Sequence, residues 1–281
     1  MYILKNDRIH IEISKIGAEI RCLQKDGTDV LYNGKSPYWN GVAPMMFPVC
    51  DGTVDGVIEV DSVRYPMIQH GYARLSEFEI ERESENSVTF LHTSNDETKK
   101  SYPFDYELRI TYILNDCALD IRYDVLNKSD RTMHFLIGSH EAYACPDGIE
   151  NYDVIFENKE TLDANIRNGR FIENKTRRIL TDSDTLPLLY EYFEIDSLVF
   201  KGVKSKSLTL KNRKTGTSVG LKFEGFDYLG FWTKMGAPFI CIEPWCGVQH
   251  TVGDSPAIET REGVNHLERG KAFTRIHTIT M

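Results

Sequence analysis

The sequence predicts an all-β fold, and three observations support this prediction. Apolar and polar residues alternate with period two along most of the chain, as in strands with one buried face. No window carries the apolar stripe of an amphipathic helix. Asp–Gly or Asn–Gly pairs, which favour tight reversals between strands, recur at 26–27, 33–34, 51–52, 55–56, 147–148 and 168–169. We therefore expect a large antiparallel β-sandwich.

Individual elements follow from the same patterns. Isoleucines at alternate positions of residues 9–13 predict a strand near the N-terminus. Residues 108–114 and 119–125 both alternate and flank a short polar turn, which predicts a β-hairpin. The aromatic-rich stretch 186–193 is long enough for one or two helical turns, and the charged run 96–100 predicts a solvated loop.

Residues 157–185 are the most polar part of the chain and raise the question of a linker. Apolar residues still recur through this stretch, which favours hairpins at the edge of one sandwich over a domain boundary. With 41% apolar residues, a chain of 281 residues can bury one large core. We therefore predict a single domain over residues 1–281.

Composition restricts the class of partner. The formal net charge of −9 and the pI near 5.4 argue against nucleic acid and against an anionic membrane surface, because both require a basic footprint. A small, neutral ligand is the expected partner. The sequence starts without the apolar stretch of a secretory signal and has no run that approaches a membrane span, so we expect a cytoplasmic protein. The oligomeric state does not follow from the sequence.

Several common chemistries find no support in the sequence. The six cysteines are scattered, with no Cys-x-x-Cys pair, and we expect reduced thiols that are mostly buried. Gly-rich phosphate loops, a Gly-x-Ser-x-Gly elbow and a His-Glu-x-x-His motif are all missing. These observations argue against nucleotide chemistry and against the commonest hydrolase designs.

Two histidines and a glutamate stand in distinctive local settings: His70, His140 and Glu243. Glu243 follows the apolar run 238–242, where an isolated carboxylate is costly, so it is either a functional group or the buried partner of an Arg or Lys. Alternation along residues 133–140 predicts that Gly138 lies on the same face as His140 and leaves room there for a ligand. Two imidazoles and a carboxylate suffice for general acid/base chemistry if the fold brings them together.

Further residues are candidates for holding a ligand. His70 and Arg74 share a loop and are able to bind hydroxyl groups, although His70 could instead cap a turn and Arg74 could pair with an acid. Asp196 precedes an apolar strand and could accept a ligand hydroxyl or form an Asx turn. Trp245 and the other tryptophans offer flat faces for a ring, with core packing as the alternative.

At these residues the chain resembles the aldose 1-epimerase (galactose mutarotase-like) family, and within it the LacX-like branch. The resemblance extends over nearly the whole length, and the order and spacing of its motifs carry it. These motifs are Tyr38-Trp39, Pro44-Met45-Met46-Phe47-Pro48, Gln69-His70-Gly71-Tyr72-Ala73-Arg74, Asn127, Gly138-Ser139-His140, Asp196-Ser197-Leu198-Val199-Phe200, Leu229-Gly230-Phe231-Trp232-Thr233-Lys234, Cys241-Ile242-Glu243-Pro244-Trp245 and Arg261-Glu262-Gly263.

The resemblance implies a β-supersandwich with an open cleft and a cofactor-free and metal-free interconversion of sugar anomers. It implies that Glu243 is the general base and His140 the general acid. The residues that match the family's substrate-binding positions are His70, Arg74, Asp196 and Trp245. Relatives that accept hexose 6-phosphates carry an Arg where this chain has residues 40–43, so we expect a free aldohexose such as glucose or galactose.

Two other functions remain compatible with these residues. A non-catalytic carbohydrate-binding or sensing protein would keep the cleft without turnover. His70, His140 and Glu243 could alternatively form a two-His-one-carboxylate metal site, since the residue types permit it.

Overall fold

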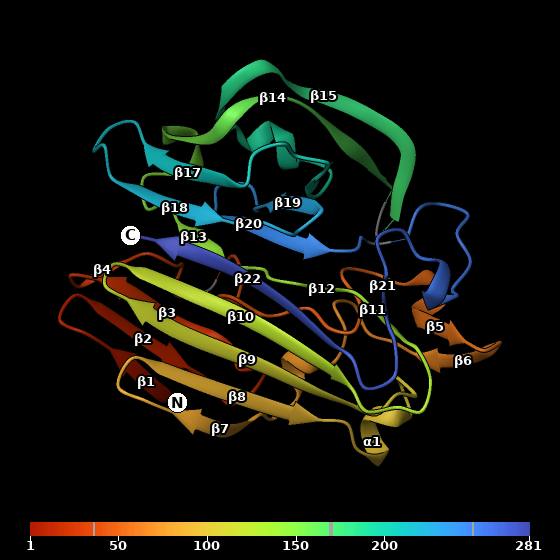
Figure 1. Cartoon of the computed structure of the whole chain (residues 1–281). Helices are drawn as coiled ribbons and strands as arrows, with labels where there is room; N and C mark the ends of the chain where they lie inside the picture. Colours follow the sequence, from red (N-terminus) through yellow and green to blue (C-terminus); the bar gives the residue numbers. More distant parts are fainter. Residues whose placement is uncertain (36, 169–170, 249) are drawn as a thin grey trace.

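The computed structural model describes residues 1–35, 37–168, 171–248 and 250–281, and antiparallel strands make up most of it (Figure 1). The predicted all-β sandwich is confirmed. Its main component is a fourteen-stranded sheet. The strand order is β12 (Ile137–Gly138), β20 (Phe239–Cys246), β19 (Tyr228–Trp232), β16 (Leu198–Lys201), β14 (Tyr152–Asn168), β17 (Ser207–Asn212), β18 (Ser218–Lys222), β22 (Ala272–Thr280), β10 (Ala118–Asn127), β9 (Tyr106–Asn115), β8 (Ser87–Thr93) and β7 (Glu79–Glu83), with β13 (Ala142–Ala144) beside β20 and β15 (Phe171–Pro187) beside β14.

A second sheet covers part of the first. It contains, in order, β1 (Tyr2–Lys5), β2 (Ile9–Ile13), β3 (Ile20–Lys25) and β4 (Thr28–Asp29). The ring of Tyr2 meets that of Phe90 on β8 edge to face at 6.2 Å. The hydroxyl of Tyr112 on β9 donates to the carbonyl of Ala18 at 2.6 Å. The alternation that predicts a strand over residues 9–13 therefore buries its isoleucines between the two sheets.

The predicted hairpin over residues 108–125 is confirmed as β9 and β10. Leu114 pairs with Leu119, and Asp116 in the turn has a positive φ of 53°. Buried and partly exposed residues alternate along both strands, as expected where one sheet face packs on the core.

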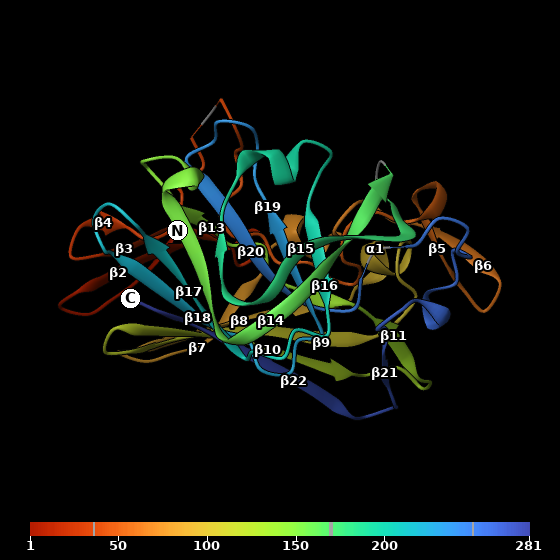
Figure 2. The same cartoon turned by 90° about the horizontal axis from the view of Figure 1, so that it is seen from above.

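The polar stretch 157–185 belongs to a long hairpin of β14 and β15, so the expectation of a hairpin is confirmed. The register of the two strands shifts several times along their length. Beyond Phe156, the last residue of β14 paired with β17, Ala164 is the only described residue of β14 that pairs with a strand other than β15, opposite Phe200 of β16. In Figure 1 this hairpin arches over the top of the molecule, and Figure 2 looks down onto it.

The remaining elements are short. Two small sheets pair β5 (Val57–Val60) with β6 (Val63–Pro66) and β11 (Met133–Phe135) with β21 (Asn265–Leu267). The short helical segments are η1 (Val54–Gly56), η2 (Ala73–Leu75), α1 (Asp96–Lys99), η3 (Ile149–Asn151), η4 (Tyr190–Phe193) and η5 (Ile258–Thr260). The helical turn expected within residues 186–193 corresponds to η4.

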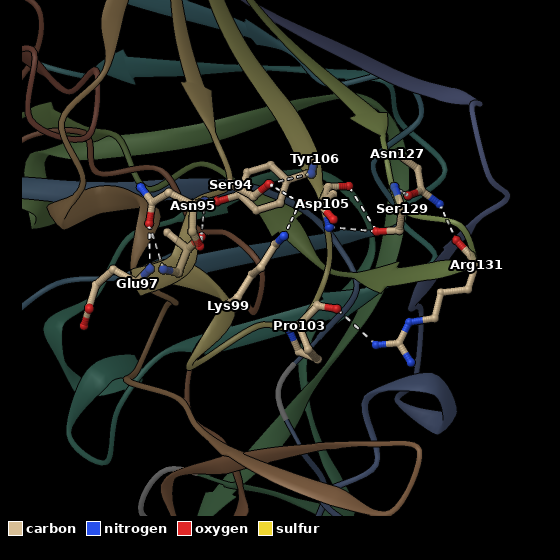
Figure 3. Close-up of polar contacts among 11 residues, drawn as sticks. Ser94, Asn95, Glu97, Lys99, Pro103, Asp105, Tyr106, Asn127, Ser129 and Arg131 are labelled. Atoms are coloured by element: carbon tan, nitrogen blue, oxygen red, sulfur yellow. Dashed lines mark hydrogen bonds and ion pairs between the residues drawn. The ribbon is translucent and has the colours of Figure 1, made fainter.

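The solvated loop expected at residues 96–100 is instead the helix α1, and that prediction was wrong. Asn95 is the reason, because its side-chain oxygen accepts the backbone N–H groups of Glu97 and Thr98 at 3.0 Å and closes a capping box (Figure 3). Lys99 then pairs with Asp105 at 2.6 Å, which ties the helix to the start of β9.

Asn127, one of the motif residues, has a structural role at the end of β10. Its amide nitrogen donates to the carbonyl of Arg131 and its oxygen accepts the N–H of Ser129, both at 2.8 Å (Figure 3). The same nitrogen also donates to the carbonyl of Leu267 at 2.8 Å. The side chain is fully buried, so these bonds satisfy it completely. Asn127 thereby joins the main sheet to β21 and lies outside the candidate site.

Candidate active site

Strand register brings His140 and Glu243 together. On one side of them Gly138 pairs with Trp245, and on the other side Ala142 pairs with Cys241. The same register places His140 directly opposite Glu243, and residues directly opposite on neighbouring strands project from the same face. The two residues that stand 103 positions apart in the sequence therefore meet because β12, β13 and β20 run side by side.

The two side chains form a buried pair. His140 Nδ1 lies 3.5 Å from Glu243 Oε1, and only 10% and 2% of the respective side chains are exposed. Aromatic rings enclose the imidazole on two sides: Trp39 stacks on it at 4.9 Å, and Trp232 meets it edge to face at 5.7 Å. The pair is shielded from bulk water by flat apolar surfaces of the kind on which sugar rings pack.

Burial also determines how the pair titrates. Desolvation, together with the negative charges of Asp51 and Glu141, raises the pKa of Glu243 well above its usual value of 4.5. Desolvation and the neighbouring His70 lower the pKa of His140 to about 3. Both effects favour a neutral carboxyl beside a neutral imidazole.

A strained loop presents His70 to the same site. His70 has a positive φ of 64°, and its backbone N–H donates to the carbonyl of Asp51 at 2.9 Å. The backbone N–H of Asp51 donates to His70 Nδ1 at 3.1 Å, so a neutral ring carries its proton on Nε2. Gly71 follows with a φ of 73°, and any Cβ there would stand 2.0 Å from the Phe47 carbonyl oxygen. His70 thus accepts a hydrogen bond from the turn, which fixes the orientation of its ring beside the cavity.

Arg74 lies in η2 and Asp196 in the bend before β16, and both line the same cavity as the acid/base pair. Arg74 Nη2 donates to the carbonyl of Gln69 at a long 3.4 Å. Its Nε is buried and has no hydrogen-bond partner among the described residues. Burial lowers the pKa of Arg74. A guanidinium held this way retains donors for a ligand.

Trp245 lies flat between two glycines on the neighbouring strands. A Cβ on Gly138 would come within 2.6 Å of the indole, and one on Gly230 within 2.8 Å. The space that Gly138 leaves is therefore filled by Trp245, and the prediction that a ligand enters this space was wrong. The alternating stretch 133–140 is divided between two sheets, because β11 pairs with β21 whereas β12 pairs with β20.

These residues surround one cavity of about 380 Å³, within the size range of small-molecule sites. All six residues singled out from the sequence line it: His70, Arg74, His140, Asp196, Glu243 and Trp245. Sequence reasoning did not select Asp51, Gln69 or Lys234, which line it as well. Asp51 follows an apolar run and precedes a glycine, as many turn residues do, so no local signal marked it.

One grouping of metal-ligand atoms occurs within the described residues. The ligand atoms of His140, Cys241 and Glu243 lie within 4.8 Å of one another. Cys241 and Glu243 share a face of β20, since they are two positions apart. A metal ion in this grouping would be bound by Cys241 in place of His70, which the sequence suggested as the third ligand.

The cysteines agree with a further expectation. All six cysteines are free thiols, four of them buried, as expected. Across the part of the chain that the structure describes, no helix is long and apolar enough to cross a membrane.

Comparison with known proteins identifies the family. The family model described as aldose 1-epimerase matches residues 1–276. The plasmid-encoded protein LacX of Lactococcus lactis subsp. lactis is 30% identical over 279 residues, covering 94% of this chain and 93% of LacX.

Two solved structures have the same fold throughout. A galactose mutarotase related enzyme from Lactobacillus acidophilus superposes with a TM-score of 0.94 at 27% identity, covering 99% of this chain and 96% of that one. A galactose mutarotase-like protein from Lactobacillus casei also gives 0.94 at 27% identity, covering 100% and 99%. Because the family model spans nearly the whole sequence, the chain belongs to the aldose 1-epimerase family.

Proposed function

We propose that the chain catalyses the interconversion of the α and β anomers of a free aldohexose, such as glucose or galactose. The observation that carries the proposal is a buried carboxylate 3.5 Å from a buried imidazole, both lining a cavity of small-molecule size. Membership of the aldose 1-epimerase family supports the reaction class.

The reaction requires two proton transfers on one sugar. Glu243 accepts the proton of the C1 hydroxyl while the bond between C1 and the ring oxygen breaks and His140 donates a proton to that oxygen. The ring opens to the aldehyde, and rotation about C1–C2 exposes its other face. Closure returns both protons by the reverse steps, so atoms and charges balance over the cycle.

His140 and Glu243 together carry one proton at each stage of this cycle. Glu243 is ionised and His140 protonated when the ring is closed, and the proton is on Glu243 when the sugar is open. Burial raises the pKa of Glu243 and lowers that of His140, so it favours the protonation state that accompanies the open sugar. A desolvated site therefore assists the ring-opening step.

The remaining wall of the cavity supplies groups to orient the sugar. We assign substrate hydroxyls to the imidazole of His70, the guanidinium of Arg74 and the carboxylate of Asp196, which all line the cavity. Trp245 supports one face of the ring, since the two flanking glycines hold its indole flat. Arg74 also offers positive charge near the developing negative charge on the sugar. These proton transfers involve protein side chains alone, so the proposal includes no cofactor.

The test is the rate of anomer exchange of α-glucose and α-galactose, followed by polarimetry and by NMR exchange spectroscopy. We expect acceleration by the wild-type protein and none above background with Glu243→Gln. Glucose 6-phosphate in parallel tests the preference for a free sugar.

Three outcomes would overturn the proposal. Calorimetric sugar binding without anomer exchange would select a carbohydrate-binding protein. Activity that disappears after chelation and returns with a metal ion would select a metal site. A wild-type rate equal to that of Glu243→Gln would remove the assigned base.

A further inference from the structure

A pair of histidines lies outside the candidate active site, on the small sheet of β11 and β21. His134 and His266 face each other in register, and their Nδ1 atoms form a hydrogen bond at 2.8 Å. Their rings stand nearly perpendicular, 80° apart, with centroids separated by 4.9 Å. Figure 1 shows this sheet at the end of the molecule that also carries β5 and β6.

A metal ion that replaces the shared proton requires a similar separation of the two nitrogens. Two imidazole nitrogens that bind one ion at about 2.0–2.1 Å in neighbouring coordination positions lie roughly 3 Å apart. Neutral imidazole is the commonest nitrogen ligand of Zn²⁺, Ni²⁺ and Cu²⁺. His134 is partly exposed and His266 is exposed, so an ion reaches the pair directly from solvent.

The charges around the pair favour a cation. Glu259 on η5 and Asp61 in the β5–β6 turn both act electrostatically on His134 with negative charge, and Arg131 acts with positive charge. Arg131 is paired with Asp61, which offsets much of its charge. Glu259 Oε2 is buried and has no hydrogen-bond partner among the described residues. An unsatisfied buried carboxylate oxygen that interacts with His134 gains from a cation bound there.

We propose that His134 and His266 bind one divalent transition-metal ion of the Zn²⁺, Ni²⁺ or Cu²⁺ class, with water at the other coordination positions and Glu259 as the neighbouring negative charge. The ion clamps β11 to β21, two segments separated by more than 100 residues in sequence. Because an ion held by both strands binds the native state more tightly than the unfolded chain, it stabilises the fold. This role is separate from the proposed sugar chemistry.

The experiment uses the full chain after removal of metal with a chelator. ZnCl₂ and CuSO₄ are titrated, the melting temperature is recorded, and the Cu²⁺ complex is examined by electron paramagnetic resonance. We expect the wild-type melting temperature to rise by about 3–6 °C at a hundredfold excess of ion over Kd. The Cu²⁺ spectrum should show two equivalent nitrogen ligands.

Matched variants locate the ion. His266→Gln and His134→Gln should each abolish the rise, and Glu259→Gln should weaken binding. His10→Gln removes a surface histidine that also neighbours a carboxylate, Glu12 at 3.1 Å, and should leave the rise unchanged. Cys241→Ser removes a ligand of the other possible grouping and should leave it unchanged too.

Three results would overturn the proposal. These are no rise in wild type, a rise that persists in His266→Gln, or a rise lost in Cys241→Ser. Anomer exchange by His266→Gln at the wild-type rate would show that the variant is folded, so failure of this proposal is distinguishable from failure of the proposed function.

Discussion

Two neighbouring residues, His140 and Glu141, each belong to a buried glutamate–histidine pair. Comparison of the two pairs shows what makes one of them a candidate for catalysis. His140 and Glu141 are consecutive in the extended segment between β12 and β13, so their side chains project to opposite sides. His140 meets Glu243, and Glu141 meets His277 with its Oε1 3.2 Å from Nε2. The residue types are the same and the distances are similar.

The two pairs differ in what surrounds them. The side chains of His277 and Glu141 are 0% and 3% exposed, and the ring of Tyr123 stacks on His277 at 5.7 Å. Burial raises the pKa of Tyr123, and the negative charge of Glu141 raises it further. The pair of His140 and Glu243 lines a cavity, whereas the pair of Glu141 and His277 does not border it. Access to a ligand, rather than the pairing itself, distinguishes the candidate catalytic pair.

The largest effect should come from replacing the two glutamates in turn. Glu243→Gln removes the proposed base, and we expect anomer exchange to slow by about 10²–10⁴-fold. Glu141→Gln keeps an oxygen for His277 and should retain activity within about tenfold. Polarimetry on both variants provides the measurement. Equal losses in the two variants would contradict the separation of roles.

The second prediction concerns stability and the sealed pair. His277→Ala leaves the Glu141 carboxylate buried without its partner, so we expect a decrease in the free energy of unfolding on the order of 3 kcal/mol. The control is His10→Ala, which breaks a surface pair with Glu12 and should change stability by less than about 1 kcal/mol. Urea denaturation measures both, and similar losses would show that burial does not distinguish the pairs.

The sequence predicts strands better than it predicts the contacts between distant strands. The hairpin of β9 and β10 follows from local alternation, because each strand has one buried face. The helix α1 was missed because the cap at Asn95, rather than an apolar stripe, stabilises it. The settings of His140 and Glu243 are visible locally, but their adjacency depends on the register between β12, β13 and β20. No local pattern encodes that register.

Gly138 illustrates the same limit. Its small size is visible in the sequence, and its position beside the candidate acid suggested room for a ligand. The indole that fills this room comes from Trp245, more than 100 residues later. Lys234 was missed for a similar reason, since its place at the cavity follows from the turn after β19.

The third prediction tests the role of this glycine in shaping the cavity. Gly138→Ala would bring a Cβ to 2.6 Å from Trp245 and 3.0 Å from Met46, so the indole must move. We expect a loss of about 1–3 kcal/mol in stability and a higher KM for the sugar. Gly220→Ala is the control, since its nearest neighbour would be at an ordinary 3.5 Å. An unchanged KM in Gly138→Ala would show that the position of the indole does not affect binding.

The smallest expected effect concerns how Glu243, in the pair that lines the cavity, changes the stability of the protein with pH. Burial raises the native pKa of Glu243 above its usual value of 4.5, so the native state favours the protonated carboxyl. The protonated carboxyl contributes its full stability below pH 4.5, and this contribution is lost as the pH rises through the native pKa of Glu243. At neutral pH the ionised carboxylate therefore lowers the free energy of unfolding. Glu243→Gln carries no charge and should be more stable than wild type by on the order of 1 kcal/mol at pH 7. The difference should vanish as the pH approaches 4, as measured by thermal unfolding across this range. A variant that is less stable than wild type at pH 7 would show that ionised Glu243 is well accommodated in the empty cavity, and that the site does not trade stability for reactivity.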